Sequence, residues 1–220
     1  EKIVITGNPV RKAIVEMKTD RTKALQFFGL DSDKITILSI GGSLGANSIN
    51  QSVEAGLNKI VSNGLQLIWQ TGKPYSEQGK LAANGIKNVW VNEFIKEMDM
   101  AYSAADVVIS RAGAMSVAEL CVAKKPTVFV PYPFAAEDHQ TFNAKALVDK
   151  DAAVMIKDSD TKTFLIDTII ALAKNEEQQE VLKTNISTQA IKNADEVIVN
   201  EIIKPGELPD VHKVEDNKIE

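Results

Sequence analysis

The stretch ITILSIGGSLGANSINQSVEAGLNKIV, residues 35–61, decides the fold. It begins with the mostly apolar run Ile35 to Ile40, passes through the turn Gly41 to Gly45, and continues with apolar residues three or four positions apart. The hydrophobic period therefore changes from that of a buried strand to that of an amphipathic helix across the glycines. Such a turn directs free backbone N–H groups and the positive end of the helix dipole at one crevice. This arrangement favours a phosphate or a similar anion.

Two familiar phosphate-binding motifs do not fit this turn. A dinucleotide fold would carry the pattern G-x-G-x-x-G and an acidic residue after the next strand, but Ser43 occupies the second glycine position and the next strand runs into Gln70. A P-loop would place a Lys and a hydroxyl residue after Gly45, where Ala46 and Asn47 stand. A third interpretation stays open, in which the glycines serve only a tight turn with positive φ.

The composition is that of an ordinary globular protein. The chain has 220 residues, is 44% hydrophobic and 25% charged, and can form one large domain with a tail. A formal net charge of −5 without a run of basic residues argues against a nucleic-acid partner. A single cysteine, Cys121, excludes an internal disulfide framework, fits a reducing compartment, and is interpreted as an inert buried thiol.

Strand-like and helix-like segments alternate along the chain. This alternation predicts an α/β fold, a Rossmann-like doubly wound parallel sheet of about six strands in the order 3-2-1-4-5-6. Besides residues 35–40, the predicted strands are 65–70, 88–92, 106–110, 127–130 and 153–156. The predicted helices after the first are 76–83, 96–104, 116–123, 140–149 and 162–174, with one or two more within 181–203. In that strand order the loop after Ile40 should face the loop after Ser110.

The loop after Ser110 is a second glycine-bearing turn, RAGAMSVAE, residues 111–119. Two such turns at one crevice strengthen the phosphate interpretation. Glu119 has two interpretations at this point. Ser116 and Glu119 have the spacing of a capping box, in which the carboxylate would hold its own helix start. Alternatively, the carboxylate could accept both hydroxyls of a ribose.

Several motifs together resemble a known family. They are GNPVR at 7–11, GGSLGA at 41–46, NEFI at 92–95, RAGAMSVAE at 111–119, VPYP at 130–133, DHQ at 138–140 and Asn143. In this order and spacing they resemble the C-terminal half of the MurG family, the UDP-N-acetylglucosamine:N-acetylmuramyl-(pentapeptide)-pyrophosphoryl-undecaprenol N-acetylglucosaminyltransferases of bacterial peptidoglycan synthesis. The resemblance implies one half of a GT-B fold that holds the donor, UDP-N-acetylglucosamine (UDP-GlcNAc).

The resemblance also implies roles for individual residues. Glu119 would bind the ribose hydroxyls, and the backbone around Phe94 and Ile95 would bind the uracil. The remaining contacts would go to the diphosphate from Arg11, Gly42 and Ser43, to the phosphates and sugar from Ala114, Met115 and Ser116, and to the N-acetylglucosamine from Gln140. No cofactor is expected, and no metal either, because no acidic metal-binding motif is identified in the sequence. Leu44 and His139 depart from the family pattern, and His139 is interpreted as an exposed cap residue rather than a base.

The same resemblance implies how the chain is divided and where it works. Residues 1–203 would form the donor domain with 1–11 near an interdomain linker, and 204–220 a flexible tail. The acceptor domain, with the catalytic residues, the lipid I site and the membrane-facing patch, would be absent. The complete enzyme would act as a peripheral protein on the cytoplasmic face of the bacterial membrane, moving GlcNAc to lipid I to form lipid II, and this chain alone would be inactive. The alternative is a stand-alone nucleotide-sugar-binding module that needs a separate partner chain.

Overall fold

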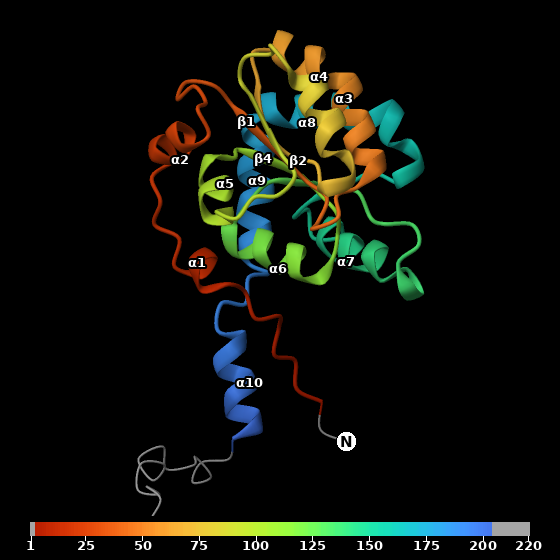
Figure 1. Ribbon diagram of the computed structural model, residues 1–220. Coiled ribbons are helices and arrows are strands. Elements are labelled where there is room, and N and C mark those ends of the chain that lie inside the picture. The colour runs from red at the N-terminus through yellow and green to blue at the C-terminus, as the bar shows by residue number, and fades with distance from the viewer. Residues whose placement is uncertain (1–2, 204–220) are drawn as a thin grey trace, which may run out of the picture.

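The computed structural model describes residues 3–203, in which six parallel strands form one sheet in the order β3-β2-β1-β4-β5-β6 (Figure 1). This confirms the predicted fold class and strand order. The strands are β1 (Thr36–Ile40), β2 (Gln66–Gln70), β3 (Val89–Asn92), β4 (Val107–Ser110), β5 (Thr127–Phe129) and β6 (Val154–Met155). Residues 204–220, for which the sequence predicts a flexible tail, lie outside the described residues.

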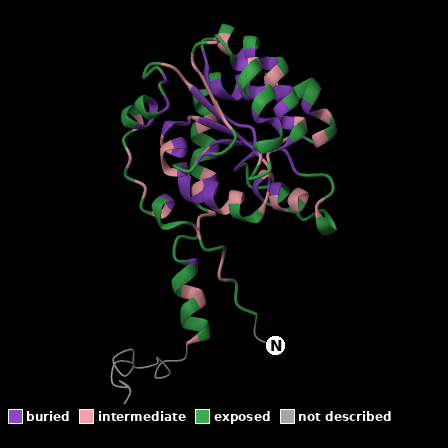
Figure 2. Cartoon of the chain, viewed as in Figure 1, coloured by how far each residue is buried: buried purple, intermediate pink, exposed green. Residues whose placement is uncertain are grey.

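Helices cover both faces of the sheet, as the continuous apolar runs of the strands require. Successive residues of β1 point to opposite faces, so that Ile37 packs in one core and Leu38 in the other. Figure 2 shows the resulting buried layer at the centre of the molecule. On one side of the sheet, the core lies between the strands and a layer of helices. These are α3 (Asn47–Ser62), η1 (Lys73–Tyr75), α4 (Ser76–Ala83) and α8 (Thr161–Lys174), which follows η3 (Asp158–Asp160). The other side carries α1 (Lys12–Val15), α2 (Arg21–Phe27), α5 (Met98–Ala104), α6 (Ala114–Ala123) and α7 (His139–Val148), which follows η2 (Ala136–Asp138). Helix α9 (Glu176–Ser187) contributes to both cores, with Leu182 in the first and Ile186 in the second.

The central strands bring the two glycine-bearing turns together. β1 pairs with β4 in parallel, and Ile40 lies opposite Ser110 at the carboxyl ends of the two strands. The loops that follow these residues therefore leave the same edge of the sheet side by side, as predicted for the switch point of such a fold.

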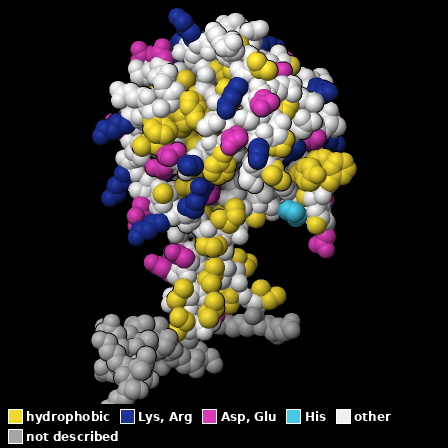
Figure 3. All heavy atoms as spheres, viewed as in Figure 1, with side chains coloured by type: hydrophobic (Ala, Val, Ile, Leu, Met, Phe, Trp, Pro, Cys, Tyr) yellow, Lys and Arg dark blue, Asp and Glu magenta, His cyan; other side chains and the backbone are white. Residues whose placement is uncertain are grey.

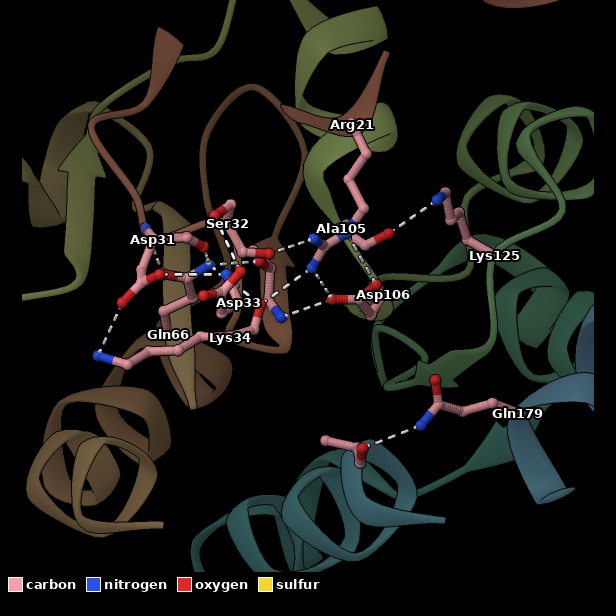
Figure 4. A network of polar contacts seen from close by, with 12 residues as sticks. Arg21, Asp31, Ser32, Asp33, Lys34, Gln66, Ala105, Asp106, Lys125 and Gln179 are labelled. Atoms are coloured by element: carbon pink, nitrogen blue, oxygen red, sulfur yellow. Dashed lines mark hydrogen bonds and ion pairs between the residues drawn. The ribbon is translucent and has the colours of Figure 1, made fainter. Parts of the chain in front are cut away.

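The opposite, amino edge of the sheet is fastened by a polar network (Figure 4). Arg21 donates to both carboxylate oxygens of Asp106, at 3.3 and 2.8 Å, and Asp106 in turn accepts from the backbone N–H of Thr36 at 2.8 Å. Gln66 donates to the backbone of Asp31 at 2.8 Å. These bonds satisfy the backbone N–H at the start of β1 and a carbonyl in the loop before it, and they tie the starts of β1, β2 and β4 together.

Two helix starts differ from their predicted positions. The helix predicted from Ser116 begins at Ala114, with Gly113 in extended conformation as its N-cap. Pro9 is favourable at the first position of a helix and so predicts Arg11 within a helical turn, but Arg11 lies immediately before α1 as the N-cap residue. Sequence patterns fix helix starts poorly when the cap has no polar side chain to mark it.

The last helix, α10 (Ala194–Ile202), projects away from the body beside the N-terminal segment (Figure 1). The amphipathic pattern of residues 181–203 predicts that Ile191 and Ile202 are buried, but they are 40% and 72% exposed because little of the domain packs against this segment. None of the helices in the described part of the chain has the length and apolar character needed to cross a membrane.

Candidate donor-binding site

Two adjoining cavities open at the carboxyl edge of the sheet, and the glycine-rich loop after β1 lines both. The smaller has a volume of about 140 Å³ and the larger about 650 Å³. Gly42 and Ser116 contribute to both, so that the two cavities meet between the starts of α3 and α6. The smaller is lined by Arg11, Ile40, Ser43, Gln70, Phe94, Ile95, Met98, Tyr102 and Glu119. The larger is lined on its sides by Leu44, Ser48, Arg111, Gly113, Tyr132, Phe134, Gln140 and Asp158.

The shape of the first loop depends on its glycines. Gly42 and Gly45 have φ values of +81° and +76°, which side-chain-bearing residues rarely adopt. A Cβ on Gly45 would lie 2.0 Å from the carbonyl oxygen of Thr71, whereas a Cβ on Gly42 would meet nothing within 4 Å. Gly45 is therefore required for packing against the chain after β2, and Gly42 presents bare backbone to the cavities.

Two helix N-termini point at the junction of the cavities. α3 begins after Ala46 and α6 after Gly113. Within the described residues, neither of these cap residues forms a side-chain hydrogen bond to the first turn of its helix. The first turns of both helices thus offer backbone N–H groups and a positive dipole end to a ligand. This is the arrangement that the two turns predicted.

Glu119 does not cap its own helix, so the capping-box interpretation is wrong. Its carboxylate is buried and binds Arg11 through two bonds, from Nε at 2.8 Å and from Nη2 at 2.9 Å. The hydroxyl of the buried Tyr102 donates to the same carboxylate at 3.2 Å. The hydrogen bond with Glu119 raises the pKa of the Arg11 guanidinium, and burial raises the pKa of the Tyr102 hydroxyl. Three of about four lone-pair positions of the carboxylate are therefore occupied.

Most of the predicted site residues line the two cavities, but not all of them. Ala114 and Met115 lie in the first turn of α6 but are not among the residues lining either cavity. The backbone N–H of Ile95 is engaged by the side-chain oxygen of Gln70 at 3.2 Å. His139 is exposed at the start of α7 and also lies outside both linings, while Leu44 is 78% exposed at the edge of the larger cavity.

The sequence interpretation missed Gln70, which bridges two loops of the site. Its amide donates to the carbonyl of Gly42 at 2.8 Å and accepts from Ile95, so it joins the glycine-rich loop to the loop after β3. The available signal was a polar residue at the carboxyl end of a buried strand next to the switch point.

The interpretation also missed an ion pair between Arg111 and Asp158 at 2.5 Å in the larger cavity. Asp158 and Asp160 have an Asp-x-Asp spacing, and the same spacing occurs at Asp31 and Asp33 and at Asp149 and Asp151, so the sequence contains this motif three times. None of the three pairs forms a metal site at the cavities, because Asp158 faces a guanidinium, Asp31 lies at the opposite edge of the sheet, and Asp149 and Asp151 follow α7 outside both cavity linings. Within residues 3–203, no three His, Cys, Asp or Glu side chains gather closely enough to hold a metal ion.

Similarity to known proteins identifies the family of this domain. Residues 36–199 match the glycosyltransferase family 28 C-terminal domain, and this range contains both glycine turns and the six strands. The chain belongs to the glycosyltransferase family 28 C-terminal domain family. The resemblance read from the motifs is thereby confirmed.

Named relatives of this family 28 domain agree with the match. This chain is 51% identical over 206 residues to a UDP-N-acetylglucosamine–N-acetylmuramyl-(pentapeptide) pyrophosphoryl-undecaprenol N-acetylglucosamine transferase of Parabacteroides distasonis. The alignment covers 93% of this chain and 56% of that protein. The chain is 45% identical to the same-named protein of Phocaeicola vulgatus, covering 99% of this chain and 58% of that one. The crystal structure of Acinetobacter baumannii MurG superposes with a TM-score of 0.70 at 30% identity, covering 86% of this chain and 54% of that one. The chain thus spans about half the length of the relatives it matches.

Proposed function

We propose that this domain binds UDP-GlcNAc as the donor-binding half of a transferase that moves GlcNAc to lipid I, forming lipid II in peptidoglycan synthesis. The observation that carries the proposal is the pair of helix starts, on α3 and α6, that meet where a small and a large cavity join. A diphosphate at this junction would have a cavity for its nucleoside on one side and a cavity for its sugar on the other. Backbone N–H groups at two helix starts stabilise negative charge on a departing UDP without reorganising.

The smaller cavity suits a uridine. Its apolar wall is formed by Ile40, Phe94, Ile95 and Met98, and its polar end by Glu119. The carboxylate has about one free lone-pair position, so accepting both ribose hydroxyls requires that Glu119 release one present bond. Arg11, whose side chain is half exposed, is the partner best able to move, and its release would place a cation near the diphosphate.

The larger cavity suits the sugar. Gln140 and Ser116 line it together with Gly42, and Gln140 carries the amide that can recognise an N-acetyl group or a hydroxyl. Cofactor chemistry has no part in the proposal, since inverting transfer from UDP-GlcNAc needs only a base for the acceptor and stabilisation of the leaving group.

An acceptor domain would complete the enzyme. We propose that residues 1–203 form the donor domain and that residues 1–11 and α10 face the second domain. Val199 and Ile202 on α10 are 50% and 72% exposed, and apolar side chains follow this helix on the face shown in Figure 3. Lipid I and the cytoplasmic face of the membrane would be contacted through that second domain.

Calorimetric titration of this chain tests the proposal. UDP-GlcNAc should bind more tightly than UDP-glucose by about tenfold, equivalent to about 1.4 kcal/mol, because only the former satisfies an amide placed for its N-acetyl group. NAD should show no saturable binding. Equal affinity for all three ligands, or binding of NAD alone, would contradict the proposal.

A further inference from the structure

The guanidinium of Arg111 is bound on several sides within the larger cavity. Nη1 donates to the Asp158 carboxylate at 2.5 Å and to the carbonyls of Val130 and Pro131 at 3.1 and 3.0 Å. Nη2 donates to the hydroxyl of Ser48 at 3.1 Å. The side chain is 11% exposed, both of its terminal nitrogens donate to protein groups, and its charge is balanced by Asp158.

These bonds join chain segments that are distant in sequence. Asp158 follows β6, Ser48 lies in the first turn of α3, and Val130 and Pro131 follow β5. Ser48 also donates to the Asp158 carboxylate, at 2.5 Å. All three segments line the larger cavity, so this cluster fixes their relative positions around it.

Tyr132 connects this cluster to the side-chain amide of Gln140. Arg111 lies over the Tyr132 ring, with 5.5 Å from Cζ to the ring centroid, and it holds the two carbonyls that precede this residue. The backbone N–H of Tyr132 donates to Oε1 of Gln140 at 3.0 Å. A backbone N–H can only donate, so this contact assigns the amide oxygen of Gln140 to Tyr132 and leaves Nε2 as the group available to a ligand.

We propose that Asp158 is a positioning residue for the sugar end of the site, acting through Arg111 and Tyr132 to present the Nε2–H of Gln140 to the donor sugar. The inference rests on the proposed donor binding. Removing the carboxylate leaves a largely buried guanidinium without its counter-charge. Arg111 then turns toward solvent, its carbonyl bonds to the loop after β5 are lost, and the Gln140 amide is free to rotate.

The test compares two ligands that differ only in the sugar. Asp158→Ala should weaken UDP-GlcNAc about tenfold in calorimetry and change UDP by less than about twofold. Asp158→Asn keeps an acceptor oxygen for Arg111 and Ser48 and should lose less than the alanine variant. Asp167→Ala, which removes an exposed carboxylate paired with Lys59 on the same side of the sheet, should leave both affinities unchanged.

A double-mutant cycle separates positioning from direct contact. If Asp158 acts through Gln140, Asp158→Ala combined with Gln140→Ala should bind UDP-GlcNAc no more weakly than Gln140→Ala alone. Full additivity of the two losses would overturn the inference, and so would equal weakening of UDP and UDP-GlcNAc by either Asp158 variant. Failure of the unaltered chain to bind UDP would instead refute the proposed function, so the two failures are distinguishable.

Discussion

At the scale of single residues, ligand binding can distinguish two roles for Glu119, which are to bind the ribose and to hold Arg11 in place. If it accepts the ribose hydroxyls, Glu119→Ala should weaken UDP about ten- to a hundredfold, because hydrogen bonds to a charged group contribute about 1.5–3 kcal/mol. Binding of 2′,3′-dideoxy-UDP should change by less than about threefold, since that ligand lacks both hydroxyls. Calorimetry with the two ligands gives both values.

Arg11→Met is the control for this prediction. It removes the ion pair but keeps the carboxylate, so it should weaken the dideoxy analogue at least as much as UDP, which no longer has to displace Arg11 from Glu119. If Glu119→Ala weakened the two ligands equally, its role would be to hold Arg11 and the ribose assignment would be wrong.

The contacts of these residues could not be read from the sequence, for a physical reason. Glu119 and Arg11 are separated by 108 positions, and Arg111 and Asp158 by 47. Such pairs depend on how loops close over the sheet, and periodicity carries no information about loop conformation. The residue types at the site were predictable, but their partners were not.

At the scale of the element, the glycine-rich loop before α3 combines a backbone requirement with a ligand requirement. Gly42→Val should lower the melting temperature, because a β-branched residue at φ +81° costs about 1–3 kcal/mol. It should also weaken UDP and UDP-GlcNAc together by blocking backbone approach to the diphosphate, with a smaller effect on uridine.

Gly64→Val is a matched control for that strain. Gly64 has φ +78° and also open space around its missing Cβ, but it follows α3 at the opposite end from the site. It should lose similar thermal stability and bind all three ligands normally. A uridine loss as large as the UDP loss in Gly42→Val would point to a folding defect.

The bounds of helices and strands were predictable where the spacing of apolar residues marks them, and unpredictable elsewhere. The predicted strand bounds agree with the observed ones to within one residue, because each strand is a short, mostly apolar run bounded by polar, glycine or proline residues. The start of α6 was missed because Gly113 caps it without a polar side chain. The amphipathic pattern of α10 was read as burial, but an apolar face states only that a partner surface is needed and not that this domain supplies it.

At the scale of the whole molecule, the order of the sheet follows from its connections. Right-handed crossovers between parallel strands leave few orders for six strands, and the reversal beside β1 makes β1 and β4 neighbours, so that the two glycine turns lie side by side. The position of these two turns was therefore predictable from the sequence even though the bonding around them was not.

The same organisation predicts that this chain binds the donor but does not transfer its sugar. Deprotonating an acceptor hydroxyl needs a base within about 3 Å of it, and in the proposed site the cavity residues would surround the nucleotide and the leaving group rather than an acceptor. With radiolabelled UDP-GlcNAc and a short-chain lipid I analogue, the 220-residue chain should give no labelled product above background. Adding the N-terminal half of a relative, in the same chain or as a separate one, should restore transfer, and restoration by a separate chain would favour a two-chain enzyme. Transfer by this chain alone would contradict the half-enzyme proposal and make His139, the histidine at the start of α7, the first residue to substitute.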